Sequence, residues 1–164
     1  MKQSDVNLLC REAAACFQRM NWALPPHPQW AATDFGLGDY SSAGLVEVLL
    51  ANEPEYCEKI MYARQDMVTP THTHGKKKED IVCRSGAIRM TLWTENPLKH
   101  PAAGSVRVQI NGQECTIACG EAFVLTPGER ITLVPGTWHE FAPRPPDTPV
   151  REVSTARSSS RPAV

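Results

Sequence analysis

From residue 45 onward the sequence is a succession of short, largely apolar stretches separated by turn residues, and this pattern constrains the fold more than any other feature. Short runs rich in Val, Ile, Leu and Tyr between turns are typical of β-strands. Asn111-Gly112 predicts a tight hairpin, because both residues tolerate positive φ. Gly120-Glu121 and Thr126-Pro127-Gly128-Glu129 predict two further turns. The predicted strands are residues 45–51, 56–64, 68–74, 80–84, 87–93, 106–110, 114–118, 122–125, 130–134, 138–142 and 150–153. This succession predicts an all-β fold, an antiparallel sandwich or barrel.

The start of the chain has a different periodicity. Apolar residues recur at helical spacing over residues 5–21, which predicts an amphipathic helix. Ser4 or Asp5 is suited to cap its start, and Leu24-Pro25-Pro26 would end it. We therefore divide the chain into an N-terminal helix and linker (1–28), a β-barrel (29–154) and a disordered tail rich in Ser, Arg and Pro (155–164).

The most specific chemical pattern is His72-Thr73-His74, followed by Glu79 and, much later, by His139 after a Pro-Gly turn. On one strand, side chains two residues apart project to the same side, about 6–7 Å apart. The chain has five histidines, and three of them belong to this pattern. Three imidazoles and a carboxylate make a site for a divalent first-row metal with positions left open for a substrate. The other two, His27 and His100, stand beside prolines and are expected to be solvated.

Composition limits the other possibilities. With 164 residues, a net charge of −1 and a pI of about 6.5, the chain fits one domain and favours neither nucleic acid nor an anionic membrane as a partner. It contains no apolar stretch long enough to span a membrane and no signal-peptide pattern, so we expect a cytoplasmic protein. The six cysteines form no C-x-x-C pair and are expected to be free thiols.

A spacing of HxH-x4-E-x6-G with a later G-x6-P-G-x-x-H resembles the two motifs of the cupin superfamily. The resemblance implies a double-stranded β-helix, or jelly-roll barrel, preceded here by the N-terminal α-helix, and association into a homodimer. Asp66 replaces the leading glycine of the first motif, Val134 stands where proline is expected, and Pro143 stands where asparagine is common. None of these departures removes a metal ligand.

A narrower resemblance is to the D-lyxose ketol-isomerases. The segments that carry it are 34–40, 43–45, 58–61, 68–74, 77–81, 125–129, 135–139 and 152–154. The family resemblance implies interconversion of D-lyxose and D-xylulose through an enediol, with D-mannose and D-fructose as a second pair. It implies that Mn²⁺, or alternatively Co²⁺, Zn²⁺ or Fe²⁺, is bound by His72, His74, Glu79 and His139. It also places Lys77 at the family's active-site lysine and Glu152 at its acid/base carboxylate.

Other interpretations of the same residues remain open at this point. Lys77 belongs to the run Lys76-Lys77-Lys78, which is typical of a solvated face, and Glu152 follows Arg151, as in a surface ion pair. Asp80 either orients a metal ligand or caps a turn. The same ligands also occur in Fe(II) cupin dioxygenases. A sugar- or metal-binding cupin with weakened catalysis is a further alternative, because the family's chain continues after Glu-Val-Ser whereas this sequence ends soon after Ser154.

Overall fold

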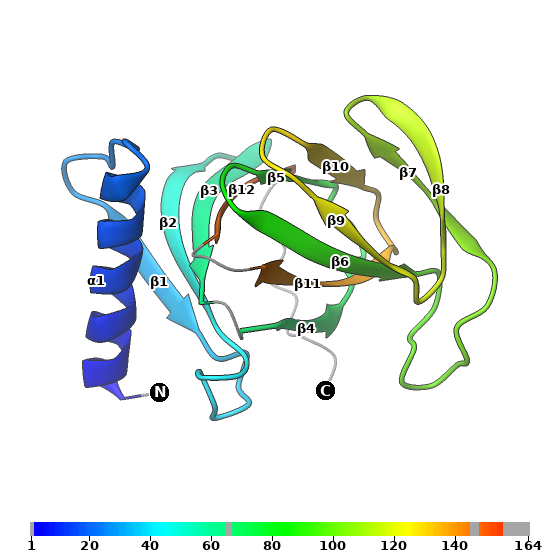
Figure 1. The fold of residues 1–164 in the computed structure, drawn as a ribbon, viewed down its shortest axis with the longest axis horizontal. Coiled ribbons are helices and arrows are strands. Elements are labelled where there is room, and N and C mark those ends of the chain that lie inside the picture. Colours follow the sequence, from blue (N-terminus) through cyan, green and yellow to red (C-terminus); the bar gives the residue numbers. More distant parts are fainter. Residues whose placement is uncertain (1, 65–66, 145–147, 156–164) are drawn as a thin grey trace.

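The computed structural model describes residues 2–64, 67–144 and, for its backbone, 148–155. One helix precedes a series of β-strands that form two sheets (Figure 1). The elements are α1 (Gln3–Arg19), β1 (Gln29–Thr33), β2 (Leu45–Asn52), β3 (Tyr56–Ala63), β4 (Thr69–His72), β5 (Glu79–Cys83), β6 (Ala87–Trp93), β7 (Ser105–Ile110), β8 (Gln113–Ala118), β9 (Ala122–Leu125), β10 (Arg130–Leu133), β11 (Trp138–Arg144) and β12 (Thr148–Thr155).

The two sheets enclose the apolar core. The larger has the strand order β1-β2-β3-β12-β5-β10-β7-β8 and the smaller β4-β11-β6-β9, and neighbouring strands are antiparallel throughout. In β6, alternate side chains point inward, which buries Ile88, Met90 and Leu92 completely. The side chains at inward positions of both sheets form one contiguous apolar cluster. The prediction of a mainly β, antiparallel fold with an N-terminal helix is therefore confirmed.

Helix α1 lies along the outside of the larger sheet, against β1 and β2 (Figure 1). It buries Leu9, Ala13, Cys16 and Phe17, a helical spacing that places them on one face. The predicted cap was wrong. The helix begins at Gln3 with Lys2 as its cap residue, and Asp5 lies one turn inside, where its carboxylate accepts a hydrogen bond from the Lys2 backbone N–H at 3.2 Å.

The predicted strands agree with the structure to within about two residues, with two informative differences. Strand β1 was not predicted, because Gln-Trp-Ala-Ala-Thr lacks a clear alternation and becomes a strand by pairing with β2 at the sheet edge. Strand β4 ends at His72, so His74 lies beyond it. The Asn111-Gly112 hairpin is confirmed, with φ values of 53° and 78°.

The six cysteines are free, as expected. Within the described residues no helix is long and apolar enough to cross a membrane. Thr155 ends β12, and the remainder of the predicted tail lies outside the described residues. The proposed boundary between 1–28 and 29–154 stays a prediction.

Candidate metal centre

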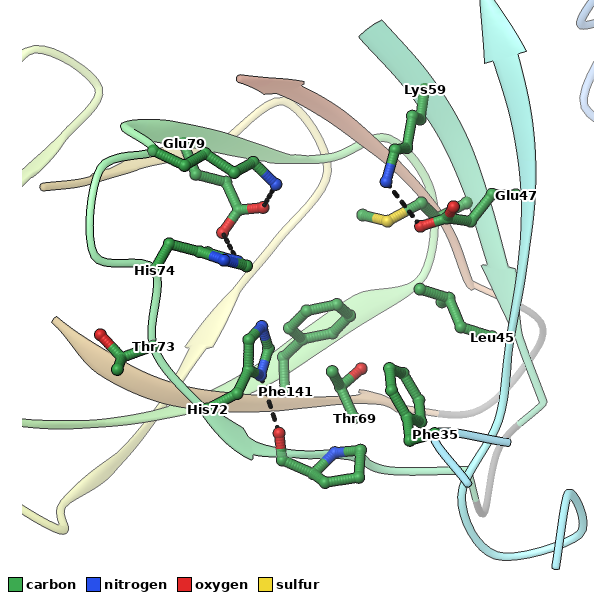
Figure 2. Close-up of a pocket in the computed structure, with 13 residues that line it drawn as sticks. Phe35, Leu45, Glu47, Lys59, Thr69, His72, Thr73, His74, Glu79 and Phe141 are labelled. Atoms are coloured by element: carbon green, nitrogen blue, oxygen red, sulfur yellow. Dashed lines mark hydrogen bonds and ion pairs between the residues drawn. The ribbon is translucent and has the colours of Figure 1, made fainter. Parts of the chain in front are cut away.

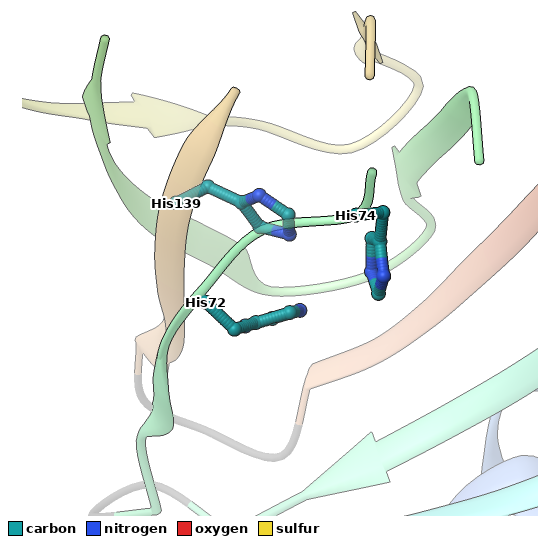
Figure 3. A group of neighbouring side chains, drawn as sticks. All are labelled: His72, His74 and His139. Atoms are coloured by element: carbon teal, nitrogen blue, oxygen red, sulfur yellow. The ribbon is translucent and has the colours of Figure 1, made fainter. Parts of the chain in front are cut away.

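Three histidines from two distant parts of the chain converge in the structure (Figure 3). His72 ends β4, and the register of the antiparallel pair β4–β11 sets His139 directly opposite it. His74 follows two residues later. One ring nitrogen from each histidine lies within 4.8 Å of the others. The predicted grouping of these three side chains is thus present in the fold.

The position of His74 differs from the one predicted. Because β4 ends at His72, the two histidines do not alternate along one regular strand, and their ring centroids lie 5.0 Å apart in an edge-on arrangement. Since His74 lies outside the strand, a hydrogen bond from a neighbouring turn holds its backbone. Gly136, at φ 88°, donates its backbone N–H to the carbonyl of His74 at 2.9 Å. The Pro-Gly turn before His139 therefore also holds the backbone of His74.

Backbone carbonyls orient two of the rings. Nδ1 of His72 lies 2.8 Å from the carbonyl of Pro70, and Nδ1 of His139 lies 3.1 Å from the carbonyl of Thr137. Because a carbonyl only accepts hydrogen bonds, each Nδ1 carries the proton and donates it. The lone pair is then on Nε2 in both rings. This arrangement is usual for histidines that bind metals through Nε2.

The environment keeps two of these imidazoles neutral. Burial lowers the pKa of His72 to about 3, with the charge of His139 as the next cause. Burial is also the main reason that the pKa of His74 falls to about 4. A neutral imidazole is the form that binds a metal, so both rings are in that form at neutral pH.

Glu79 completes the group from the start of β5. Its Oε2 lies 3.4 Å from Nε2 of His139 and 3.6 Å from Nε2 of His74. Its other oxygen, Oε1, accepts a hydrogen bond of 2.6 Å from Nζ of Lys77. Glu79 is 4% exposed and Lys77 8%. The solvated-face interpretation is wrong for Lys77, although Lys76 and Lys78 on either side of it are exposed.

The donor set fits a divalent cation. Within the described residues, the buried Nε2 of His139 has no hydrogen-bond partner, and leaving such an atom unsatisfied is costly. Ring nitrogens of three histidines lie close together beside a carboxylate oxygen of Glu79, an arrangement that a cation stabilises. His72, His74, Glu79 and His139 are thus together in space, while metal binding by them stays a prediction.

A cavity of about 140 Å³ opens beside this cluster. Sequence reasoning missed several residues of its wall, most notably Glu47 of β2 and Lys59 of β3. Nζ of Lys59 donates to Oε1 of Glu47 at 2.9 Å, across the cavity from the histidines (Figure 2). Two signals could have pointed to them: Glu47 is a single acid inside the apolar run 45–49, and Lys59 lies in segment 58–61, which carries part of the family resemblance. The full lining is Phe35, Leu45, Glu47, Lys59, Met61, Thr69, Pro70, His72, Thr73, His74, Lys77, Glu79 and Phe141.

The remaining candidates have different positions. The Cα of Glu152 pairs with Lys59 on one side and with Ile81 on the other, while its side chain lies outside the described residues. The carboxylate of Asp80 accepts a hydrogen bond from the hydroxyl of Thr132 and lies 3.9 Å from Nη1 of Arg130, so the contacts of its side chain are with β10. His27 and His100 are exposed, as expected.

Two antiparallel sheets around a core, with the histidines at one end of an internal cavity, define this protein as a cupin-type barrel. The L-ribose isomerase of Cellulomonas parahominis has the same fold, with a TM-score of 0.70 over 96% of this chain and 85% of that one, at 17% identity. The D-lyxose isomerase family model matches residues 27–161, and the chain belongs to that family.

Two curated relatives agree with this assignment. The D-lyxose/D-mannose isomerase of Escherichia coli O157:H7 is 35% identical, in a match that covers 68% of this chain and 53% of the relative. That of Serratia proteamaculans is 31% identical and the match covers 86% and 76%. The chain thus spans about half the length of the first relative and three quarters of the second. These sugar isomerases give the dioxygenase alternative no support.

Proposed function

We propose that this protein is a metal-dependent aldose–ketose isomerase that interconverts D-lyxose and D-xylulose, with D-mannose and D-fructose as a second pair. One observation carries the proposal. In a member of the D-lyxose isomerase family, three histidines and a glutamate converge at one end of a cavity of small-molecule size. Open ligand positions beside a cavity are suited to binding sugar oxygens.

His72, His74, Glu79 and His139 would hold the cation, with Mn²⁺ as the proposed metal. A divalent ion there supplies a Lewis acid that polarises the sugar carbonyl and stabilises negative charge on its oxygens. Glu79 is a suitable anionic ligand because Lys77 neutralises its other oxygen. The carboxylate therefore keeps one oxygen directed toward the histidines.

The proton transfer is assigned to Glu152. As a carboxylate it takes the proton from C2 of the aldose and returns it to C1, so that no proton is gained or lost overall. The hydroxyl proton moves from O2 to O1 in the same conversion. Backbone register supports this role, since Glu152 lies between Lys59 and Ile81 on strands that flank the cavity.

Lys77 is assigned a role next to the reacting carbons. It lines the cavity and donates one hydrogen bond to Glu79. An ammonium group has three N–H donors, so Lys77 can fix Glu79 and also donate to a sugar oxygen. We further propose a homodimer in the cytoplasm, in keeping with the cupin resemblance.

The direct test is incubation of the protein with D-lyxose and added Mn²⁺, with a chelator in the control, and detection of D-xylulose by chromatography. Ketose formation that depends on the metal is the expected result. Absence of D-xylulose and of D-fructose from D-mannose, while the metal is bound stoichiometrically, would contradict the proposal.

A second experiment tests the base. Glu152→Gln removes the carboxylate with little change in size, so kcat should fall by about a hundredfold or more. Metal content, measured by atomic emission, should stay at the wild-type level, because Glu152 is not among the proposed ligands. Wild-type turnover in this variant would exclude Glu152 from the proton transfer.

A further inference from the structure

The ion pair between Lys59 and Glu47 lies on the wall of the cavity opposite the histidines (Figure 2). Their side chains are only 12% and 16% exposed. The inward neighbours on the same two strands, Leu45 and Met61, are buried and apolar. A mostly apolar stretch of wall therefore contains one acid and one base, in contact with each other and facing the cavity.

Stability does not account for this pair. Moving two charges out of water costs about as much as their attraction returns, and apolar residues of similar size are often more stabilising at such positions. Strands β2 and β3 are already joined by an antiparallel backbone ladder, so they need no side-chain link. An acid and a base at this position are better explained by a polar ligand in the cavity.

The chemistry of the pair selects the kind of ligand. A carboxylate accepts hydrogen bonds and an ammonium donates them, whereas a hydroxyl group does both. Neighbouring hydroxyls of a polyol can therefore bind both partners at once. Lys59 is paired with Glu47, and Lys77 with Glu79, so neither of these lysines offers an uncompensated positive charge to a phosphate group. The wall suits an uncharged polyol.

We propose that Glu47 and Lys59 form a subsite that binds the hydroxyl groups of the sugar chain remote from the reacting carbons. The inference rests on the proposed function, which places those carbons at the histidine end of the cavity. Lys59 donates to the remote hydroxyls, and Glu47 accepts from them while it fixes the position of the Lys59 ammonium. The backbone register partner of Lys59 on β12 is Glu152.

Two uncharged ligands test the subsite without catalysis. D-Arabinitol is the reduced form of D-lyxose, and erythritol is the same chain without the terminal CH₂OH group; neither has a carbonyl to isomerise. Binding of each to the Mn²⁺-loaded protein is measured by calorimetry. Glu47→Gln should weaken the binding of D-arabinitol about tenfold, as expected for a lost hydrogen bond to a charged group. The same variant should change the affinity for erythritol by less than twofold.

Exposed Glu53 provides the matched control. Glu53→Gln removes the same charge outside the cavity and should leave both affinities unchanged. If Glu47→Gln weakens neither polyol, or weakens both equally, the subsite is wrong. It is also wrong if the wild-type protein binds erythritol as tightly as D-arabinitol.

A stability measurement separates recognition from structure. The double variant Glu47→Leu/Lys59→Met should keep the wild-type Tm, because an apolar pair fits the neighbouring Leu45 and Met61, while D-arabinitol binding is lost. A Tm that falls by many degrees would assign the pair a structural role and overturn the proposal.

Kinetics then distinguish this inference from the proposed function. If the wild-type protein isomerises D-lyxose, Glu47→Gln should raise KM about tenfold and change kcat less, as for contacts made equally in ground and transition states. A drop in kcat with constant KM would contradict the subsite. If the wild-type protein isomerises nothing yet shows the predicted polyol pattern, the proposed reaction fails and the subsite remains.

Discussion

Two lysine–glutamate pairs lie at opposite ends of one cavity, and their surroundings differ. Lys77 and Glu79 are separated by one residue, are almost fully buried and are 2.6 Å apart. Lys59 and Glu47 come from adjacent strands, are slightly more exposed and are 2.9 Å apart. The second carboxylate oxygen of Glu79 faces two imidazoles, whereas the cavity wall around Glu47 is mostly apolar.

The comparison indicates that the function of each ion pair depends on the groups that its carboxylate faces besides the lysine. At the histidine end, Lys77 contacts one oxygen of Glu79, and the other oxygen faces His74 and His139. At the far end, the pair borders the cavity on a mostly apolar stretch of wall. Removing the lysine should therefore damage the first end through stability and metal affinity, and the second through ligand affinity.

The largest difference is expected when each lysine is removed in turn. Lys77→Met leaves Glu79 buried without its ammonium partner, which should destabilise the metal-free protein by about 3–5 kcal/mol. Lys59→Met should cost less, because Glu47 borders the cavity and can be reached by water. Lys76→Met, next to Lys77 but exposed, should change stability by less than about 0.5 kcal/mol. Urea denaturation of the three variants measures how much stability each one loses. An equal loss of stability for Lys77→Met and Lys76→Met would contradict the expected order.

A second experiment sharpens the contrast at the histidine end. His139→Ala removes a buried ring whose Nε2 faces Glu79, and Mn²⁺ affinity should fall by at least about a hundredfold, more than is usual for residues that only support ligands. His100→Ala is the matched control, since His100 is exposed and remote from the cluster. Metal titration followed by EPR measures both. Unchanged affinity in His139→Ala would exclude this histidine as a ligand.

The same contrast shows what the sequence could predict. The residues of the histidine end are recognisable because they are rare types at fixed spacing, and most of them lie in the short stretch from His72 to Glu79. The far end was missed because Glu47 and Lys59 are common residue types, and only the pairing of β2 with β3 brings them together. The burial of Lys77 could not be predicted either, since the sequence pattern does not distinguish Lys77 from Lys76 and Lys78. Strand β1 was missed for a related reason, as its pairing with β2 is what makes it a strand.

The smallest effect on stability is expected from mild acid, which changes the protonation of the histidines. In the unfolded chain an imidazole has a pKa of about 6.5, whereas burial lowers the pKa of His72 to about 3 and of His74 to about 4 in the folded protein. The unfolded state therefore binds more protons as the pH falls below about 6.5, and stability declines from there until the folded pKa values are passed. At pH 5.5 each histidine should lower the free energy of unfolding by about 1 kcal/mol relative to pH 7.5. The decrease should be somewhat smaller for His74, which is more accessible.

Urea denaturation of the metal-free protein at pH 7.5, 6.5 and 5.5 measures this decline, in a window above the ordinary pKa of carboxyl groups. The variant His72→Gln/His74→Gln should show a shallower decline, because two of the groups that take up protons on unfolding are gone. An identical slope in the variant would mean that these two rings are not held neutral by the fold. Saturating Mn²⁺ should restore stability at pH 5.5 in the wild-type protein and not in the variant, since only the former keeps the imidazole lone pairs that a cation needs.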